Sequence, residues 1–213
     1  VCSSDLEVLA GQGQAALLLE FARTQGLDLS PFQVVAQAMQ SQRKLSAASY
    51  LQALHDFFKQ RPERDSSFLL GQNLLPGHYG HRSQALIHAP DLRHALRHLV
   101  QHYQQLSPLL RPRLLESPRY LILYWSDSYG VPALRNHLVE MHMAALTGLS
   151  RWLAEQRLPW RFCFNRCSPK NLEHLQLFLG YDLHFDCQLD AMLIPREHAD
   201  LAWPRANQTA WQL

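Results

Sequence analysis

The chain has 213 residues, of which 47% are hydrophobic and 18% are charged, and its formal net charge at pH 7 is +2. A chain of this length buries roughly 70% of the surface that it exposes when unfolded, so it forms one or two hydrophobic cores without disulfides. The small net charge, with Lys and Arg scattered along the sequence, argues against the concentrated basic face that a nucleic-acid-binding domain needs.

The longest apolar runs are also too short for a membrane span. Ala15 to Leu19 is one of them, whereas a transmembrane helix needs roughly 20 apolar residues. No secretory signal precedes the helical pattern, so we expect a cytoplasmic protein without a membrane partner.

The N-terminal part of the sequence predicts helices. Residues 1–6 resemble the translation of a sequencing adapter, and we set them aside as a non-native segment. Residues 7–66 then predict a helical lobe, because apolar residues recur there at helical spacing. The predicted helices are Ala15–Gln25, Pro31–Ser41 and Ser46–Lys59.

A polar run from Arg61 to Ser67 separates this lobe from a second one, residues 67–206, in which helices and strands alternate. The predicted elements are a helix over Pro90–Leu106, a hairpin over Leu110–Trp125, a long helix over Pro132–Gln156 and a strand over Trp160–Arg166. The pair Ser117 and Pro118 marks the hairpin turn.

Residues 168–195 predict a helix followed by two short strands. Ser168 is a suitable N-cap, Pro169 suits the first helical position, and Gly180 supplies a left-handed end. Leu183 and Phe185 then alternate with polar residues, and a second apolar run ends at Pro195.

Together these elements predict an α+β fold, in which an N-terminal helical lobe is followed by a mostly antiparallel sheet packed against long helices. The helix over Pro132–Gln156 carries the clearest core-facing stripe. Its members are Leu134, Leu138, Met141, Ala145, Leu149 and Trp152.

Two blocks of the sequence resemble the sensory domain of AraC/XylS-type bacterial transcription regulators, in the branch described as arabinose-binding. The first runs from Phe178 through Gly180 to Pro195, with an alternating strand, a turn and an apolar strand in between. The second, Leu69 to Leu106, is similar to the family's glycine-containing turn and the helix after it. Its matching positions are Gly77, Gly80, Pro90, Ala95 and Leu96, and the resemblance extends from about Ala15 to Trp203.

This resemblance implies a ligand-sensing, regulatory domain of a DNA-binding transcriptional regulator, most often an activator, and not an enzyme. It implies a small-molecule effector as the partner, no cofactor, and a homodimer as a compatible assembly. DNA would be contacted only through a helix-turn-helix domain that we expect beyond residue 213. The effector itself does not follow, because family members respond to chemically varied molecules.

A sensor of this kind needs a cavity, and we predict it between the long helix and a sheet face that carries Tyr124, Phe162 and Phe164. Met141 and His142 lie near the edge of that packing. The residues predicted to contact the ligand are Tyr124, Met141, His142 and Phe164.

The 12 histidines leave a second hypothesis open, a stand-alone metal or haem sensor or a metalloenzyme. His94, His98 and His102 recur every fourth residue, but the apolar stripe of their helix directs His94 and His98 to a solvated face, where Arg93 and Arg97 repel a cation. The sequence therefore predicts no metal site on this helix.

Other signatures of metal binding and catalysis are absent from the sequence. His137, Glu140 and His142 lack the HExxH order of a metalloprotease, and no phosphate-binding or nucleophile-elbow motif is present. Without Cys2 of the adapter-like segment, the remaining cysteines are Cys163, Cys167 and Cys187. Their spacing is not that of common zinc sites, so we predict free thiols.

Overall fold

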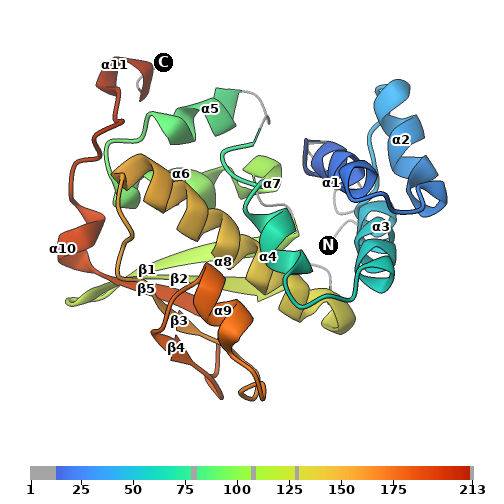
Figure 1. The fold of residues 1–213 in the computed structure, drawn as a ribbon. Coiled ribbons are helices and arrows are strands. Elements are labelled where there is room, and N and C mark those ends of the chain that lie inside the picture. The colour runs from blue at the N-terminus through green and yellow to red at the C-terminus, as the bar shows by residue number, and fades with distance from the viewer. Residues whose placement is uncertain (1–12, 78–80, 107–108, 128–129, 212–213) are drawn as a thin grey trace.

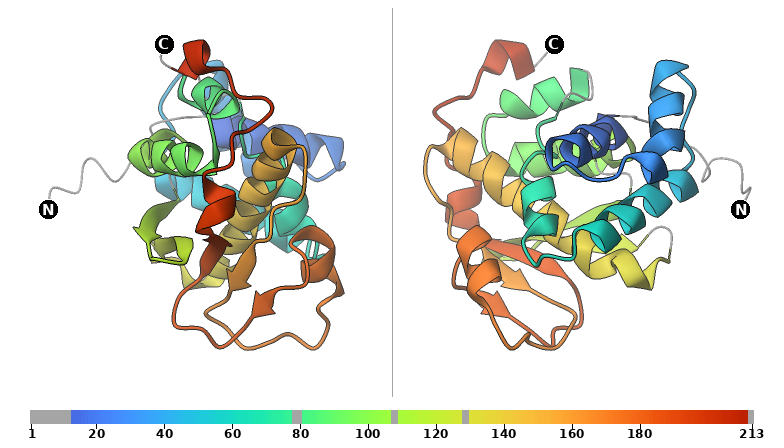
Figure 2. Two further views of the ribbon diagram at one scale, coloured as in Figure 1. Left: turned by 90° about the vertical axis from the view of Figure 1, so that its left-hand side faces the viewer. Right: turned by 45° about the vertical axis from the view of Figure 1, so that its right-hand side comes forward.

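The computed structural model describes residues 13–77, 81–106, 109–127 and 130–211. Three helices and a 3₁₀ turn form a helical group at one end of the molecule, away from the strands β3 and β4 (Figure 1; Figure 2, right). These elements are α1 (Gly13–Thr24), η2 (Ser30–Phe32), α2 (Gln33–Gln40) and α3 (Ala47–Gln60). They confirm the three helices predicted from the sequence. The adapter-like residues 1–6 lie outside the described residues.

The stretch between the helical group and the sheet is more helical than the sequence predicted. It holds α4 (Ser66–Gly71), α5 (His81–Ile87), α6 (Leu92–Gln101) and α7 (Tyr103–Leu106). The helix predicted over Pro90–Leu106 is thus two helices. It begins after Asp91, whose carboxylate accepts the backbone N–H of His94 at 2.8 Å, and it is interrupted at His102. Gly80 of the predicted turn lies outside the described residues.

In the described part of the chain the sheet has five strands, in the order β1-β2-β5-β3-β4. These are β1 (Leu110–Glu116), β2 (Tyr120–Asp127), β3 (Arg161–Cys163), β4 (Leu183–His184) and β5 (Ala191–Pro195). Neighbouring strands are antiparallel except β3 and β4, which are parallel. The hairpin turn forms where predicted, since Tyr120 donates its backbone N–H to the hydroxyl of Ser117 at 2.9 Å. The predicted α+β class is therefore confirmed.

The long helix α8 (Pro132–Ala154) crosses one face of the sheet (Figures 1 and 2). Its predicted apolar stripe is buried with one exception, Trp152, whose exposed fraction is 45%. The core-facing position of the last turn belongs to Leu153, which follows Leu149 by four residues and is fully buried. The guanidinium of Arg205 lies over the exposed Trp152 ring at 5.2 Å.

The helix after β3 begins later than predicted. Neither Ser168 nor Pro169 starts it, because α9 spans Glu173–Phe178. The side chain of Asn171 accepts the backbone N–H of Glu173 at 2.8 Å, which closes a turn just before the helix. Gly180 ends it with a φ of 111°, as the sequence predicted. Two short helices follow β5, α10 (Arg196–Ala199) and α11 (Gln208–Trp211).

One charged residue of α6 lies where we did not expect it. Arg93, predicted on a solvated face, is only 7% exposed. It donates to Asp200 at 3.0 Å and also contacts Glu116, so it ties α6 to β1 and to the end of α10. A buried arginine of this kind is retained only because it is paired on both sides.

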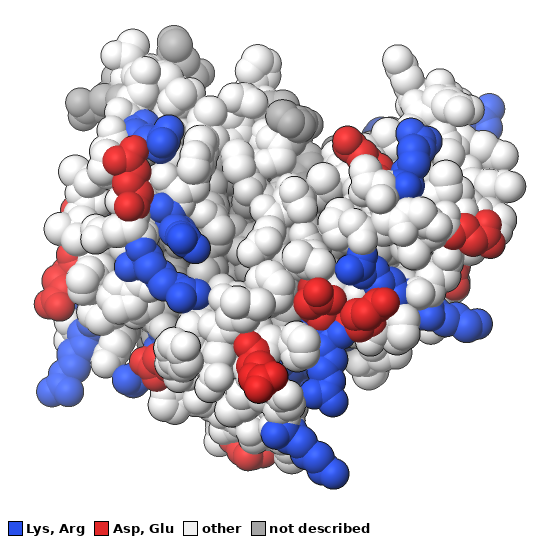
Figure 3. Space-filling view, in the orientation of Figure 1, with Lys and Arg blue, Asp and Glu red and all other residues white. Residues whose placement is uncertain are grey.

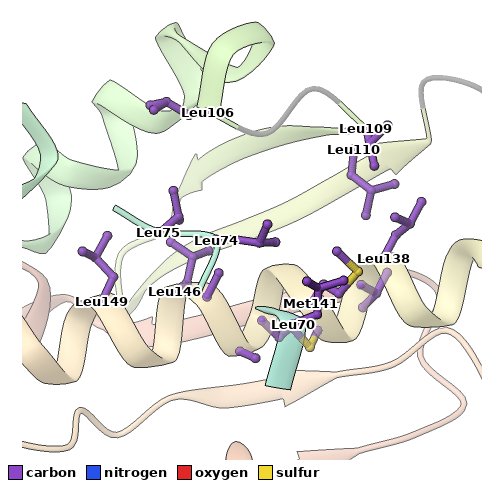
Figure 4. Close-up of a cluster of buried hydrophobic side chains, with 14 of the residues drawn as sticks. Leu70, Leu74, Leu75, Leu106, Leu109, Leu110, Leu138, Met141, Leu146 and Leu149 are labelled. Atoms are coloured by element: carbon purple, nitrogen blue, oxygen red, sulfur yellow. The ribbon is translucent and has the colours of Figure 1, made fainter. Parts of the chain in front are cut away.

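The core is continuous from the helical group to the sheet, and α4 packs most closely against α8. Figure 4 shows Leu70 beside Met141, and Leu74 and Leu75 near Leu146 of the long helix. At the contact, a β-carbon on Gly71 would lie 2.7 Å from the backbone Cα of Met141. Only glycine permits the two helices to approach this closely.

This contact gives a first prediction. Gly71→Ala lowers the free energy of unfolding by about 3 kcal/mol, because the added methyl group meets backbone that cannot turn aside. Gly148→Ala is the matched control, since a β-carbon there meets nothing within 4 Å. The control raises stability by up to about 1 kcal/mol through helix propensity. Urea unfolding measures both, and equal effects of the two substitutions would contradict the packing described.

Candidate functional site

A cleft of about 370 Å³ opens where the segment between α3 and α4, the first half of α8 and the segment after β3 meet. Its walls come from residues 62–68, residues 133–140 of α8 and residues 166–175. This volume lies within the range of small-molecule sites in proteins. The cleft therefore lies between segments that are distant in sequence, which only the folded chain brings together.

The wall contributed by α8 follows directly from helix geometry. Ala133, Asn136, His137 and Glu140 occur at positions i, i+3, i+4 and i+7, so they share one face of the first half of the helix. The core stripe occupies a different face. The polar residues Asn136, His137 and Glu140 recur at helical spacing in the sequence. Our prediction did not use this signal.

An ion pair forms part of the cleft wall. Arg166 donates to a carboxylate oxygen of Glu140 at 2.6 Å, and the hydroxyl of Ser67 donates to the other oxygen. The exposed fraction of the side chain is 12% for Glu140 and 19% for Arg166. The guanidinium of Arg166 also lies 4.8 Å from the centre of the Phe164 ring. The pair is thus shielded on its inner side and reachable from the cleft.

His137 lies beside this ion pair. Its ring stacks on Phe58 of α3, with the ring centres 4.0 Å apart and an angle of 10° between the planes. Burial lowers the pKa of His137; nearby Glu140 opposes this shift and Arg166 adds to it. The imidazole is therefore neutral at pH 7 and offers one donor and one acceptor.

Two buried polar atoms at the cleft have no hydrogen-bond partner within the described part of the chain. They are Nδ1 of His137 and Nε of Arg166. Unpaired buried polar atoms are uncommon and often mark the place of a bound molecule or water. Figure 3 shows acidic and basic side chains gathered on this face, over the region between α9 and α3. The arrangement suits a polar ligand.

The structure separates Tyr124 from the other predicted ligand-contacting residues. Met192 of β5 is paired with both Leu123 and Phe162, whereas Tyr124 is paired with Ala191. Paired residues share a face and adjacent residues point to opposite faces. Tyr124 and Phe162 therefore lie on opposite sides of the sheet, and the single aromatic face that we predicted is wrong for Tyr124.

Met141, His142 and Phe164 are buried and do not line the cleft. Met141 and Phe164 are fully buried, and His142 is 5% exposed. Phe164 stacks on Phe185 and lies behind Arg166, so it supports the cleft wall from within. Contact of Tyr124, Met141, His142 and Phe164 with a ligand stays a prediction.

The histidines of α6 take part in local contacts. His94 contacts its helix cap Asp91 at 2.8 Å. His98 is half-buried and donates to the backbone carbonyl of Arg82 at 2.9 Å, and the guanidinium of Arg82 contacts His102. Burial lowers the pKa of both His98 and His102.

The other described His, Cys, Asp and Glu residues do not form a metal site either. Among the described residues, no group of three or more His, Cys, Asp or Glu side chains is arranged to hold a metal ion. Cys163, Cys167 and Cys187 are free thiols. No described helix is both long enough and apolar enough to cross a membrane.

The domain is thus an α+β domain with a charged cleft whose volume is that of a small-molecule site. Residues 28–203 match the model of a family described as the arabinose-binding domain of AraC transcription regulators, N-terminal. The chain belongs to this family. The family is one of regulatory ligand-binding domains and not of enzymes.

A solved structure has the same fold. It is the crystal structure of the transcriptional regulator CdpR from Pseudomonas aeruginosa, which is similar to 92% of this chain with a TM-score of 0.68 and 12% sequence identity. This chain covers 59% of the CdpR chain. No curated protein sequence matches.

The buried His142 gives a second prediction. Its Nδ1–H donates to the carbonyl of Leu138 at 2.6 Å, and burial lowers its pKa to about 4. Below about pH 6.5 the unfolded chain therefore binds a proton that the folded chain does not, so stability falls as the pH drops from about 6.5 toward 4. Between pH 7 and pH 5 the loss from this residue is about 2 kcal/mol.

Denaturant unfolding of His142→Gln at the two pH values tests this. The variant should lose correspondingly less stability on acidification than the wild type. His55→Gln is the control, because the side chain of His55 is 53% exposed on α3. An unchanged pH dependence in His142→Gln would show that this imidazole is not held neutral by burial.

Proposed function

We propose that this chain is the sensing domain of a transcription activator and that its small-molecule effector binds in the cleft beside Glu140 and Arg166. The observation that carries the proposal is the cleft itself, whose wall holds a shielded ion pair and two polar atoms without a hydrogen-bond partner among the described residues. The family supports a regulatory role, since it consists of ligand-binding domains of transcription regulators.

The position of the cleft suits a sensor. A ligand there would contact the segment leading out of α3, the first half of α8 and the segment before α9 at the same time. It would favour any arrangement in which these three segments fit it best. A ligand shifts the equilibrium between two conformations only if it binds one of them more tightly. When the three segments move relative to one another, the contacts in the cleft change, and so does the affinity for the ligand.

DNA would be bound by a separate helix-turn-helix domain of the full regulator, whose placement on a promoter the effector would bias. We propose a homodimer as the working assembly and the bacterial cytoplasm as its location, where the DNA is. This chain itself has a net charge of only +2, which is little for a DNA-binding surface.

A ligand screen tests the site. An effector at a hundred times its Kd should stabilise the protein by about 2.7 kcal/mol, seen as a raised Tm. Asn136→Ala should reduce this response, since Asn136 lines the cleft and is exposed, so its loss should leave the core intact.

Tyr124→Ala serves as the comparison, because Tyr124 lies on β2 outside the cleft wall. An effector whose Tm shift is abolished by Tyr124→Ala and unaffected by Asn136→Ala would move the site from the cleft to the sheet face that carries Tyr124. Loss of the response in Asn136→Ala alone supports the cleft.

A further inference from the structure

The ion pair in the cleft wall restricts which ligands fit there. Glu140 and Arg166 are each other's counter-ion, and both are largely withdrawn from water. Removing one partner from such a pair leaves a poorly solvated charge, which costs far more than the pair itself contributes. A ligand that binds to one of these two side chains must therefore leave the other with a partner of opposite charge.

Arg166 can form further hydrogen bonds besides the one to Glu140. Arg166 carries only donors, and its Nε has no partner within the described residues. The group best suited to a guanidinium edge is a carboxylate, which accepts two parallel hydrogen bonds. A ligand that carries only a carboxylate would share Arg166 with Glu140 and would place two negative groups beside one guanidinium.

A ligand that carries only an ammonium group fails for the opposite reason, because it would bind Glu140 and leave Arg166 without a counter-ion. A molecule with both charges supplies a partner to each side chain and leaves the total charge of the site unchanged. We infer that the cleft binds a zwitterion of the amino-acid type, with its carboxylate at Arg166 and its ammonium group at Glu140. This inference rests on the proposed function of the cleft.

The rest of the cleft agrees with a ligand that has no net charge. At its rim the charges of Glu63 and Arg64 are opposite in sign, and the other polar lining includes Asn136 and Asn171. Beside the ion pair, the neutral ring of His137 offers hydrogen bonds without a charge. These groups would bind the remainder of the molecule.

The test uses the purified chain and matched sets of probes in a thermal-shift assay followed by calorimetry. The probes are the standard amino acids and ω-amino acids such as 5-aminovalerate, each compared with its deaminated acid and its decarboxylated amine. For 5-aminovalerate these are valerate and butylamine. We expect at least one zwitterion to bind, and its acid and amine to bind about tenfold more weakly or worse. Failure of every zwitterion to bind, or equal affinity for an acid or amine, overturns the inference.

Two substitutions test the roles of the charges. In Glu140→Gln the ammonium partner is lost and Arg166 is released, so the deaminated acid should gain affinity relative to the zwitterion. In Arg166→Gln the decarboxylated amine should gain affinity relative to the zwitterion. Arg161→Gln is the control, because it removes an arginine that forms a more exposed ion pair, with Asp182 at 3.1 Å, outside the cleft. No change of preference in either cleft variant overturns the inference.

The double variant Glu140→Gln with Arg166→Gln covers the case in which a single variant does not fold, since it leaves neither charge stranded. It should bind none of the three probe types, and unchanged binding of the zwitterion would refute the assignment. If a molecule of another class binds and Asn136→Ala weakens it, the zwitterion inference fails while the proposed function stands. If binding is insensitive to every cleft substitution, both fail.

Discussion

The close approach of α4 to α8 at Gly71 is the contact on which the rest of the structure depends. Without a side chain at Gly71, the backbone of α4 lies directly against that of Met141. This places the first turn of α4, which includes Ser67, beside the first half of α8, where the hydroxyl of Ser67 donates to Glu140. The same contact therefore closes the core on one side and forms a wall of the cleft on the other.

Helix α8 serves two purposes because different faces of it carry different residues. Its apolar stripe packs into the core, as the cluster around Leu138, Met141 and Leu146 shows (Figure 4). The face with Asn136 and Glu140 meets the cleft. A rigid helix buried along most of its length holds these polar groups at fixed positions, and such preorganisation favours specific binding.

The predicted ligand-contacting residues show what a sequence pattern can identify and what it cannot. The pattern identified α8 and the strands correctly, but it gave no register between strands. A shift of one residue moves a side chain to the other face of a sheet, and this is why Tyr124 was grouped with Phe162 although they lie on opposite faces. Arg166 was missed for a related reason, since its partner Glu140 is 26 residues away in the sequence.

The sequence by itself determined the class of fold, the three N-terminal helices, the hairpin, α8 and the family, because these depend on local periodicity, turn residues and glycine positions. It also predicted the glycine that ends α9. Only the tertiary structure decided the strand order, the short helices α4 and α5, the burial of Arg93 and the cleft. The reason is physical: local patterns record how each residue meets its neighbours along the chain. A charged pair or a cleft between residues 62 and 175 depends instead on contacts that no local pattern contains.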